Sequence, residues 1–290
     1  MEWFYLALIS AISLALADAF SKKYFQAYSG WELLLIRFSI PGLLLMPVTL
    51  LGSYPSLDSE FWLWIAGLVP LELFAMLLYS LAIRDSALHL TLPYLAFTPV
   101  FNVITGNVIL GEVVSTEKLL GILLVVFGAY LLNTKKHAIT HPKQLLLPLV
   151  SIVAEKGSRL MLIAAIVYSF TSVLGKGAMQ FVEPEYFGAF YFSVIGCAGL
   201  LVTLLIRPTS IRVIFHKPIS IMTVGFFMAI MVVSHFMAIA LVEVAYMITV
   251  KRTSLLFGII LGALMFSEKG LAQHFIAGTL MVLGVGIILI

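Results

Sequence analysis

Apolar runs of about 20 residues follow one another along almost the whole chain, separated by short polar connections. A helix of that length crosses a hydrocarbon core of about 30 Å and satisfies its own backbone in lipid. No alternation of apolar and polar residues marks these runs, as a membrane barrel would require. Only 11% of the residues are charged and 62% are hydrophobic, whereas a soluble domain has roughly 25% charged residues. The sequence therefore predicts an all-α membrane protein.

We expect ten transmembrane helices, five in each half of the chain. The predicted spans of the first half cover residues 3–22, 31–51, 60–82, 88–110 and 117–133. Those of the second half cover residues 159–180, 185–206, 219–241, 245–266 and 271–290. Residues 134–158 between them form a basic connecting loop, whose apolar part is too short to cross and is expected to lie along the interface. The first run follows Glu2 instead of a basic segment, so we expect a span and not a cleaved signal peptide.

The second half of the chain repeats the pattern of the first. A shift of 156 residues places Phe101 on Phe257, Gly106 on Gly262, Glu112 on Glu268 and Gly128 on Gly284. A shift of 154 places Lys22 on Lys176, Gln26 on Gln180 and Gly42 on Gly196, and the loop after Leu51 would absorb the difference. Because five spans is an odd number, the second unit (159–290) must enter the membrane inverted relative to the first (1–133). Inverted repeats are typical of secondary transporters, with a substrate site between them near the midplane.

The distribution of basic residues predicts an orientation. Connections after the odd-numbered spans hold twelve Lys and Arg residues, and the opposite side holds only Lys118. The twelve are Lys22, Lys23, Arg84, Lys135, Lys136, Lys143, Lys156, Arg159, Arg207, Arg212, Lys217 and Lys269. This distribution favours termini outside the cytoplasm.

Several segments together resemble one transporter family. Thr98-Pro99-Val100-Phe101 followed by Leu110-Gly111-Glu112 and a glycine-bearing apolar helix resembles the drug/metabolite transporter superfamily, and more narrowly its ten-helix EamA-type branch. The segment from Ala17 to Lys23 with Leu35-Ile36-Arg37-Phe38 is similar to that family's first two helices, and Lys251-Arg252-Thr253-Ser254 to the ninth helix of some members. The resemblance implies a secondary transporter of small metabolites, often exported, with peripheral helices five and ten. It also implies termini in the cytoplasm, against the charge distribution.

Ionisable side chains inside spans are the first candidates for function, because each costs about 2.5–3.5 kcal/mol to insert. Glu72 lies near the middle of the third span, and Tyr79 follows on the same helical face. Glu72 could bind a cationic substrate or accept a coupling proton, or it could be locked to a neighbouring helix. Asp18 could line the path or form a local pair with Lys22. His235, the repeat partner of Tyr79, could sense protons or simply pack.

Basic residues within the spans suggest an anionic group on the substrate. Arg37 lies in the second span, and Lys251 and Arg252 lie in the ninth. Guanidinium groups suit carboxylates and phosphates, whereas the structural alternative is snorkelling of long side chains to the interface.

Uncharged polar stripes complete the candidate path. The fourth span carries side chains spaced for one helical face: Thr91, Thr98, Asn102 and Thr105. The sixth span carries a weaker stripe of Tyr168, Ser172 and Gly175. Such stripes either line an aqueous path or hydrogen-bond a neighbouring helix. Pro93 and Pro99 should loosen the fourth span, as in the interrupted helices of transporters.

Other polar residues favour structural roles. Glu112 and Glu268 sit at helix ends, where we expect them to pair with backbone donors or a nearby Lys. His137 and His141 have the spacing of a zinc helix but lack the metalloprotease Glu, which is Ala138 here. The single Cys197 excludes an intrachain disulfide. No nucleotide-binding, nucleophile or metal motif is present in the sequence, so we expect no enzyme activity, no cofactor and no metal.

The sequence thus predicts a non-ATP transporter of the plasma membrane, whose expected substrates are small polar or zwitterionic metabolites such as amino acids. The candidate binding and pathway residues are Asp18, Arg37, Glu72, Tyr79, Thr98, Asn102, Tyr168, Ser172, His235, Lys251 and Arg252. Its partners would be this solute and the lipid bilayer, not nucleic acid; coupling to a proton or other ion and a homodimer stay open. The alternatives are a lipid flippase of the same fold, a non-transporting membrane assembly protein and a lipid-modifying enzyme, which would need an acid/base or metal cluster near one interface.

Overall fold

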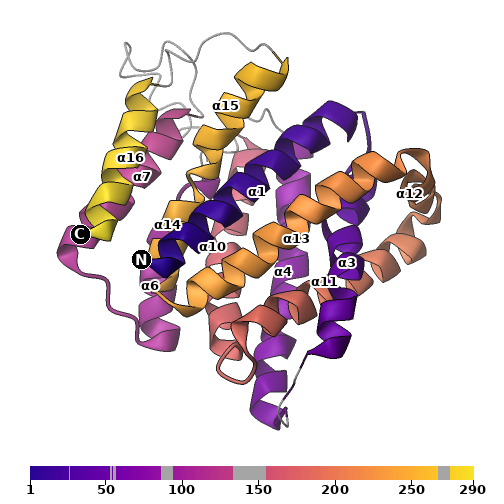
Figure 1. Cartoon of the computed structure of the whole chain (residues 1–290), viewed down its shortest axis with the longest axis horizontal. Coiled ribbons are helices and arrows are strands. Elements are labelled where there is room, and N and C mark those ends of the chain that lie inside the picture. Colours follow the sequence, from indigo (N-terminus) through magenta and orange to yellow (C-terminus); the bar gives the residue numbers. More distant parts are fainter. Residues whose placement is uncertain (26, 53, 55–56, 86–93, 133–154, 267–274) are drawn as a thin grey trace. The chain divides into compact units, whose positions relative to one another are not determined.

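The computed structural model describes residues 1–25, 27–52, 54, 57–85, 94–132, 155–266 and 275–290, and all regular structure in them is helical (Figure 1). The first half contains α1 (Glu2–Phe25), α2 (Gly30–Leu34), the π-helical turn η1 (Leu35–Ser39), α3 (Ile40–Leu51), α4 (Ser59–Asp85), α6 (Thr98–Leu110) and α7 (Thr116–Leu132). The second half contains α10 (Lys156–Ala178), α11 (Pro184–Ile206), the 3-10 turn η2 (Pro208–Arg212), α12 (Val213–His216), α13 (Pro218–Ala240), α14 (Val244–Lys251), α15 (Ser254–Phe266) and α16 (Phe275–Leu289).

Seven helical segments of the described chain are long and apolar enough to cross a membrane. They are Glu2–Phe25, Gly30–Leu51, Ser59–Tyr79, Lys156–Ala178, Pro184–Ile206, Pro218–Ala240 and Val244–Phe266. Each coincides with a predicted span, which confirms the helical class. α10 begins at Lys156, so the last residues of the predicted loop at 134–158 are helical. The rest of that loop, together with Thr91, Pro93, Glu268 and Lys269, lies outside the described residues.

Two spans are interrupted at equivalent positions. α6 begins at Thr98 after a turn at residues 96–97, and α15 begins at Ser254 after a turn at residues 252–253. The two turns are 156 residues apart, the offset of the sequence repeat. The expected loosening of the fourth span is confirmed, with Pro99 in the first turn of α6, where a missing N–H is tolerated. At each interruption the backbone forms turn hydrogen bonds, such as that from the Phe97 N–H to the Tyr94 carbonyl oxygen and that from the Thr253 N–H to the Val250 carbonyl oxygen.

The helices pack into two compact units, and each unit combines helices from both halves of the sequence. The first unit comprises Met1–Phe61, Ala178–Leu241 and Leu256–Glu268. Within it α1 packs along α13, and α3 packs along α11 (Figure 1). α3 and α11 approach closely because glycines face each other: a Cβ on Gly42 would lie 3.0 Å from the Gly196 Cα atom, and a Cβ on Gly196 would lie 3.1 Å from the Gly42 Cα atom. These two residues are repeat equivalents, and small residues permit such backbone contact in lipid.

The second unit comprises Trp62–Gly177, Val242–Leu255 and Lys269–Ile290. Within it α7 lies along α16, and α6 packs against α14 (Figure 1). A Cβ on Gly121 would lie 2.7 Å from the Gly284 carbonyl oxygen, and a Cβ on Gly128 would lie 2.7 Å from the Ala277 carbonyl oxygen. Since the lower-numbered residue of one helix meets the higher-numbered residue of the other, α7 and α16 run antiparallel.

Candidate functional site

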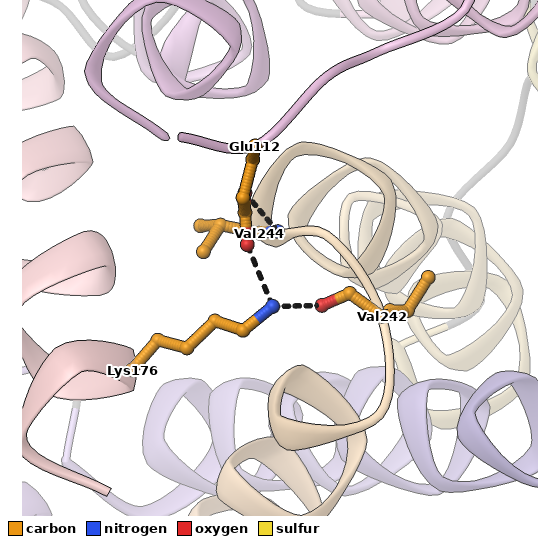
Figure 2. Close-up of polar contacts among 4 residues, drawn as sticks. All are labelled: Glu112, Lys176, Val242 and Val244. Atoms are coloured by element: carbon orange, nitrogen blue, oxygen red, sulfur yellow. Dashed lines mark hydrogen bonds and ion pairs between the residues drawn. The ribbon is translucent and has the colours of Figure 1, made fainter. Parts of the chain in front are cut away.

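An ion pair in the second unit joins three separate segments of the chain. Lys176, near the end of α10, donates from Nζ to Glu112 Oε1 at 2.6 Å and to the Val242 carbonyl oxygen at 2.6 Å. The other carboxylate oxygen, Oε2, accepts from the Val244 backbone N–H at 2.9 Å (Figure 2). Val244 is the first residue of α14, and the first N–H groups of a helix have no acceptor within that helix. Glu112 therefore neutralises the Lys176 ammonium and caps α14 at once. We call these four residues the Glu112 junction.

The local sequence shapes this junction. Gly111 closes α6 in the left-handed conformation with φ 69°, which favours glycine. The reversal brings the Glu112 carboxylate back over α6, where a Cβ on Gly106 would lie only 2.7 Å from Oε2. Asn107 Nδ2 also donates to the Glu112 carbonyl oxygen at 3.0 Å. The structural role expected for Glu112, with backbone donors and a Lys as partners, is confirmed; Glu268 lies outside the described residues.

A buried polar face of α6 occupies another part of the second unit. Thr98, Asn102 and Thr105 of α6 are 1%, 0% and 7% exposed, so the predicted stripe is one buried helix face. Thr98 Oγ1 donates to the Leu95 carbonyl oxygen and Thr105 Oγ1 to that of Phe101. Neither the oxygen nor the nitrogen of the Asn102 amide has a hydrogen-bond partner within the described chain. An unsatisfied buried polar group costs about 1–3 kcal/mol, so this amide is suited to a ligand or water.

Arg252 belongs to the same unit and lies at the interruption between α14 and α15. Its side chain is half-buried, and its Nε atom is buried without a hydrogen-bond partner in the described residues. The guanidinium interacts electrostatically with Tyr168 of α10 and Tyr79 of α4. Those two rings pack on apolar clusters formed by α4 and α10. Asn102 is carried by α6, which packs against α14, the helix whose C-terminal cap is Arg252. We use the name buried polar cluster for Tyr79, Asn102, Tyr168 and Arg252, which four segments of the same unit contribute.

Three further predicted residues, Glu72, Ser172 and Lys251, belong to the same unit. Glu72 is half-buried at the middle of α4, and Lys251 is half-buried at the end of α14. Ser172 Oγ donates to the Tyr168 carbonyl oxygen at 2.8 Å, so its hydroxyl is engaged within α10. Glu72 and Lys251 each interact with other groups of the protein, so neither side chain is without a partner.

Three of the predicted residues belong to the first unit. Arg37 Nη1 lies 2.5 Å from Asp18 Oδ1, so Asp18 pairs with the second span, whereas the sequence offered Lys22 as its local partner. Arg37 sits in the π-helical turn η1, a distortion that often marks functional positions. His235 of α13 packs its ring against Phe236, with centroids 5.0 Å apart. The eleven predicted residues thus form two groups, one in each unit.

Lys176 is the functional residue that sequence reasoning missed. In the sequence repeat, Lys176 is equivalent to Lys22, and Glu112 is equivalent to Glu268. A lysine and a glutamate that both recur in the two halves could have indicated that they form an ion pair. Tyr246 was also missed: its hydroxyl accepts from the Ser115 N–H at 3.2 Å, and Lys118 Nζ lies 5.2 Å from its ring centre. Nothing in the local sequence signals that contact.

The site chemistry is that of binding and ion pairing. Among the residues that the structure describes, no three His, Cys, Asp or Glu side chains are grouped so as to hold a metal ion. The unsatisfied groups of the buried polar cluster are an amide and a guanidinium nitrogen, which can hold a polar solute through hydrogen bonds.

Comparisons with known proteins agree with this architecture. A family model described as "EamA-like transporter family" matches residues 1–134 and 155–290. The comparison with curated proteins gave no match. Among solved structures 28 chains match. One, described only as "Crystal structure of protein", is 16% identical with a TM-score of 0.75, over 98% of this chain and 95% of that one. At this identity the likeness shows the fold alone.

Proposed function

Because this chain belongs to the EamA-like transporter family, we propose that it is a secondary transporter that exports a small polar metabolite, such as an amino acid or a related solute. Its family and its apolar helices make it a multi-pass integral membrane protein and a membrane transporter. The substrate, the direction and an alternating-access mechanism are our proposal. The sequence has no nucleotide-binding motif, so uphill transport would draw on an ion or solute gradient.

The observation that carries the proposal is the buried polar cluster beside two interrupted spans. Arg252 lies in one interruption, and α6, which carries Asn102, begins directly after the other. Interrupted helices at corresponding positions of two repeats are the best structural indication of a transporter substrate site. A buried amide and a buried guanidinium nitrogen without partners are unfavourable unless a solute or water satisfies them.

The chemistry of the cluster favours a substrate with a carboxylate. A guanidinium and an amide N–H₂ both donate to carboxylate oxygens, and the charge-assisted bond is about twice as strong as a neutral one. Tyr79 and Tyr168 interact electrostatically with the same guanidinium and add two hydroxyl groups that can donate or accept hydrogen bonds. Glu72, half-buried in α4 of the same unit, is our candidate for proton coupling or for binding a substrate amine.

We further propose ten spans arranged as two inverted five-helix repeats, residues 1–133 and 159–290. Three contacts support this arrangement. Gly42 meets its own repeat equivalent Gly196, as residues near a two-fold axis would. Gly121 is the repeat equivalent of Ala277, and Gly128 is the repeat equivalent of Gly284. The contact of Gly121 with Gly284 is therefore equivalent to the contact of Gly128 with Ala277, and the two helices run antiparallel. Antiparallel equivalent helices are expected of inverted repeats and not of parallel ones.

Transport into proteoliposomes tests the proposal. The purified protein would be assayed with a panel of labelled amino acids and the corresponding amino amides, with and without a pH gradient. We expect transport of carboxylate-bearing substrates, with Arg252→Gln lowering it by about tenfold or more because a charge-assisted bond is lost. Lys118→Gln, which removes a charge that lies outside the cluster, should leave transport unchanged. Equal transport by Arg252→Gln and the unmodified protein would remove the cluster as the binding site.

A separate experiment tests the proposed role of Glu72 in proton coupling. Glu72→Gln should abolish the response of transport to the pH gradient while exchange of substrate across the membrane persists. If the variant still responds to the gradient, Glu72 is not the coupling residue. Movement of labelled lipid, with no solute transported from the panel, would favour the flippase alternative.

A further inference from the structure

A cavity lined mainly by polar and charged residues lies in the first unit. Its volume is about 520 Å³. One wall comes from Ser29, Trp31 and Glu32 at the start of α2, and the other from the connection between α11 and α13. That connection supplies Arg207, Thr209, Ser210, Arg212 and His216. We call this cavity the basic pocket.

The cations of the basic pocket have no anionic partner in the described chain. The side chains of Arg207 and Arg212 are exposed, and no hydrogen bond or ion pair to either guanidinium occurs among the described residues. Glu32 is the acidic side chain of the lining, but its Oε2 atom already accepts from the N–H and the hydroxyl of Ser29, both at 2.7 Å. The pocket therefore presents two guanidinium groups that form no ion pair with the described residues, against the single carboxylate of Glu32, and carries a net positive charge.

The pocket also holds neutral donors suited to phosphate oxygens. Thr209 and Ser210 contribute hydroxyl groups from the 3-10 turn between the two arginines. The Nδ1 atom of His216 lies 2.8 Å from the Arg212 carbonyl oxygen, which orients the imidazole at the pocket wall. Guanidinium forks bind phosphate through paired N–H bonds, so this set of groups matches a phosphate better than a cation or an apolar group.

Apolar side chains flank the same connection. Leu205 and Ile206 precede it and are 75% and 57% exposed, while Phe215 and Ile219 near its other end are 80% and 83% exposed. In a membrane protein such side chains face acyl chains, whereas the pocket beside them holds the charges. An amphiphile with a phosphate head and hydrocarbon tails would contact both surfaces. Basic pockets beside transmembrane helices are typical binding sites for anionic lipid headgroups.

We infer that the basic pocket binds the phosphate headgroup of an anionic phospholipid through Arg207 and Arg212. The site is separate from the buried polar cluster and does not depend on the proposed substrate. Soluble phosphate shares the same chemistry, and the flanking apolar side chains favour the lipid.

Lipid binding by the full-length, delipidated protein in detergent tests this inference by native mass spectrometry. Phosphatidylglycerol would be titrated against phosphatidylcholine with identical acyl chains, and separate samples would contain inorganic phosphate. We expect phosphatidylglycerol to bind about tenfold more tightly or better, because both lipids offer a phosphate but the choline cation of phosphatidylcholine cancels its charge and is repelled by the guanidinium groups. The double variant Arg207→Gln with Arg212→Gln should lose this preference.

A matched control removes two positive charges elsewhere on exposed helix ends. Lys23→Gln with Lys156→Gln should keep the preference for phosphatidylglycerol, which excludes a simple effect of net charge. Equal binding of the two lipids by the unmodified protein, or an unchanged preference in the arginine double variant, would overturn the inference. Displacement of phosphatidylglycerol by millimolar inorganic phosphate would assign the pocket to soluble phosphate instead and reject the lipid as its ligand. Size-exclusion chromatography checks that each variant remains folded.

Discussion

Lys176 Nζ lies 2.6 Å from Glu112 Oε1 although the two residues are 64 positions apart in the chain. The same ammonium and the same carboxylate also hold the segment that leads into α14. The end of α10, the segment after α6 and the start of α14 are therefore held together by one ion pair. Its side chains are only 22% and 10% exposed, so water does not replace either partner fully.

The first prediction concerns this ion pair. Glu112→Gln should destabilise the protein by about 1–3 kcal/mol, because the partly buried Lys176 ammonium loses its counter-charge and α14 loses a charged cap. The thermal midpoint in detergent should fall by several degrees. Combining Glu112→Gln with Lys176→Met should be less damaging than the sum of the two single changes, as expected for coupled residues. Glu117→Gln, in the exposed first turn of α7, is the control. Additive effects in the double variant would contradict a direct ion pair.

The second prediction concerns the contact of α7 with α16. A Cβ on Gly284 would lie 2.6 Å from the Gly121 carbonyl oxygen and 2.8 Å from Val125 Cγ2. Gly284→Ala should therefore force the helices apart and destabilise the protein by about 1–3 kcal/mol, the usual range for overpacking. Farther along the same helix, a Cβ on Gly286 would meet no atom within 4 Å. Gly286→Ala should be neutral or slightly stabilising, since alanine is the better helix former. Equal thermal midpoints for the two variants would show that this packing is not tight.

The third prediction separates binding from packing in the buried polar cluster. Asn102 is fully buried and its amide has no partner in the described structure. Asn102→Leu has a similar volume and removes an unsatisfied group, so the free energy of unfolding should rise by about 1 kcal/mol or more. Transport should fall, because the substrate loses a hydrogen-bonding partner. Thr105→Val, one turn away, is the control, since its hydroxyl is already bonded within α6. A less stable Asn102→Leu variant with normal transport would assign the amide a structural role.

Local sequence was sufficient to predict the seven helices that are long and apolar enough to cross a membrane, and the similarity of the two halves. A run such as residues 3–22 can satisfy its backbone only as a helix in lipid, so α1 forms there whatever its neighbours are. Pro99 likewise indicated an interruption of the fourth span. The equivalent interruption at Arg252 was not predicted, because no proline lies there; its helix end is distinguished only by its position in the repeat.

Contacts between distant segments could not be predicted. The sequence offered Asp18 a local lysine partner four residues away, but the structure also pairs Asp18 with Arg37, nineteen residues away in η1. The eleven candidate residues looked like one pathway in sequence, but Asp18, Arg37 and His235 belong to one compact unit and the other eight to the second.

By itself, the sequence determined an all-helical membrane protein of two repeated halves and the family to which it belongs, since apolar length and residue identity are local properties. Only the tertiary structure decided which charges are paired, as in Glu112 with Lys176, and which buried groups are left without partners, as in Asn102 and Arg252. Hydrogen bonds act over about 3 Å, and only the folding of the chain determines which distant side chains come within that distance.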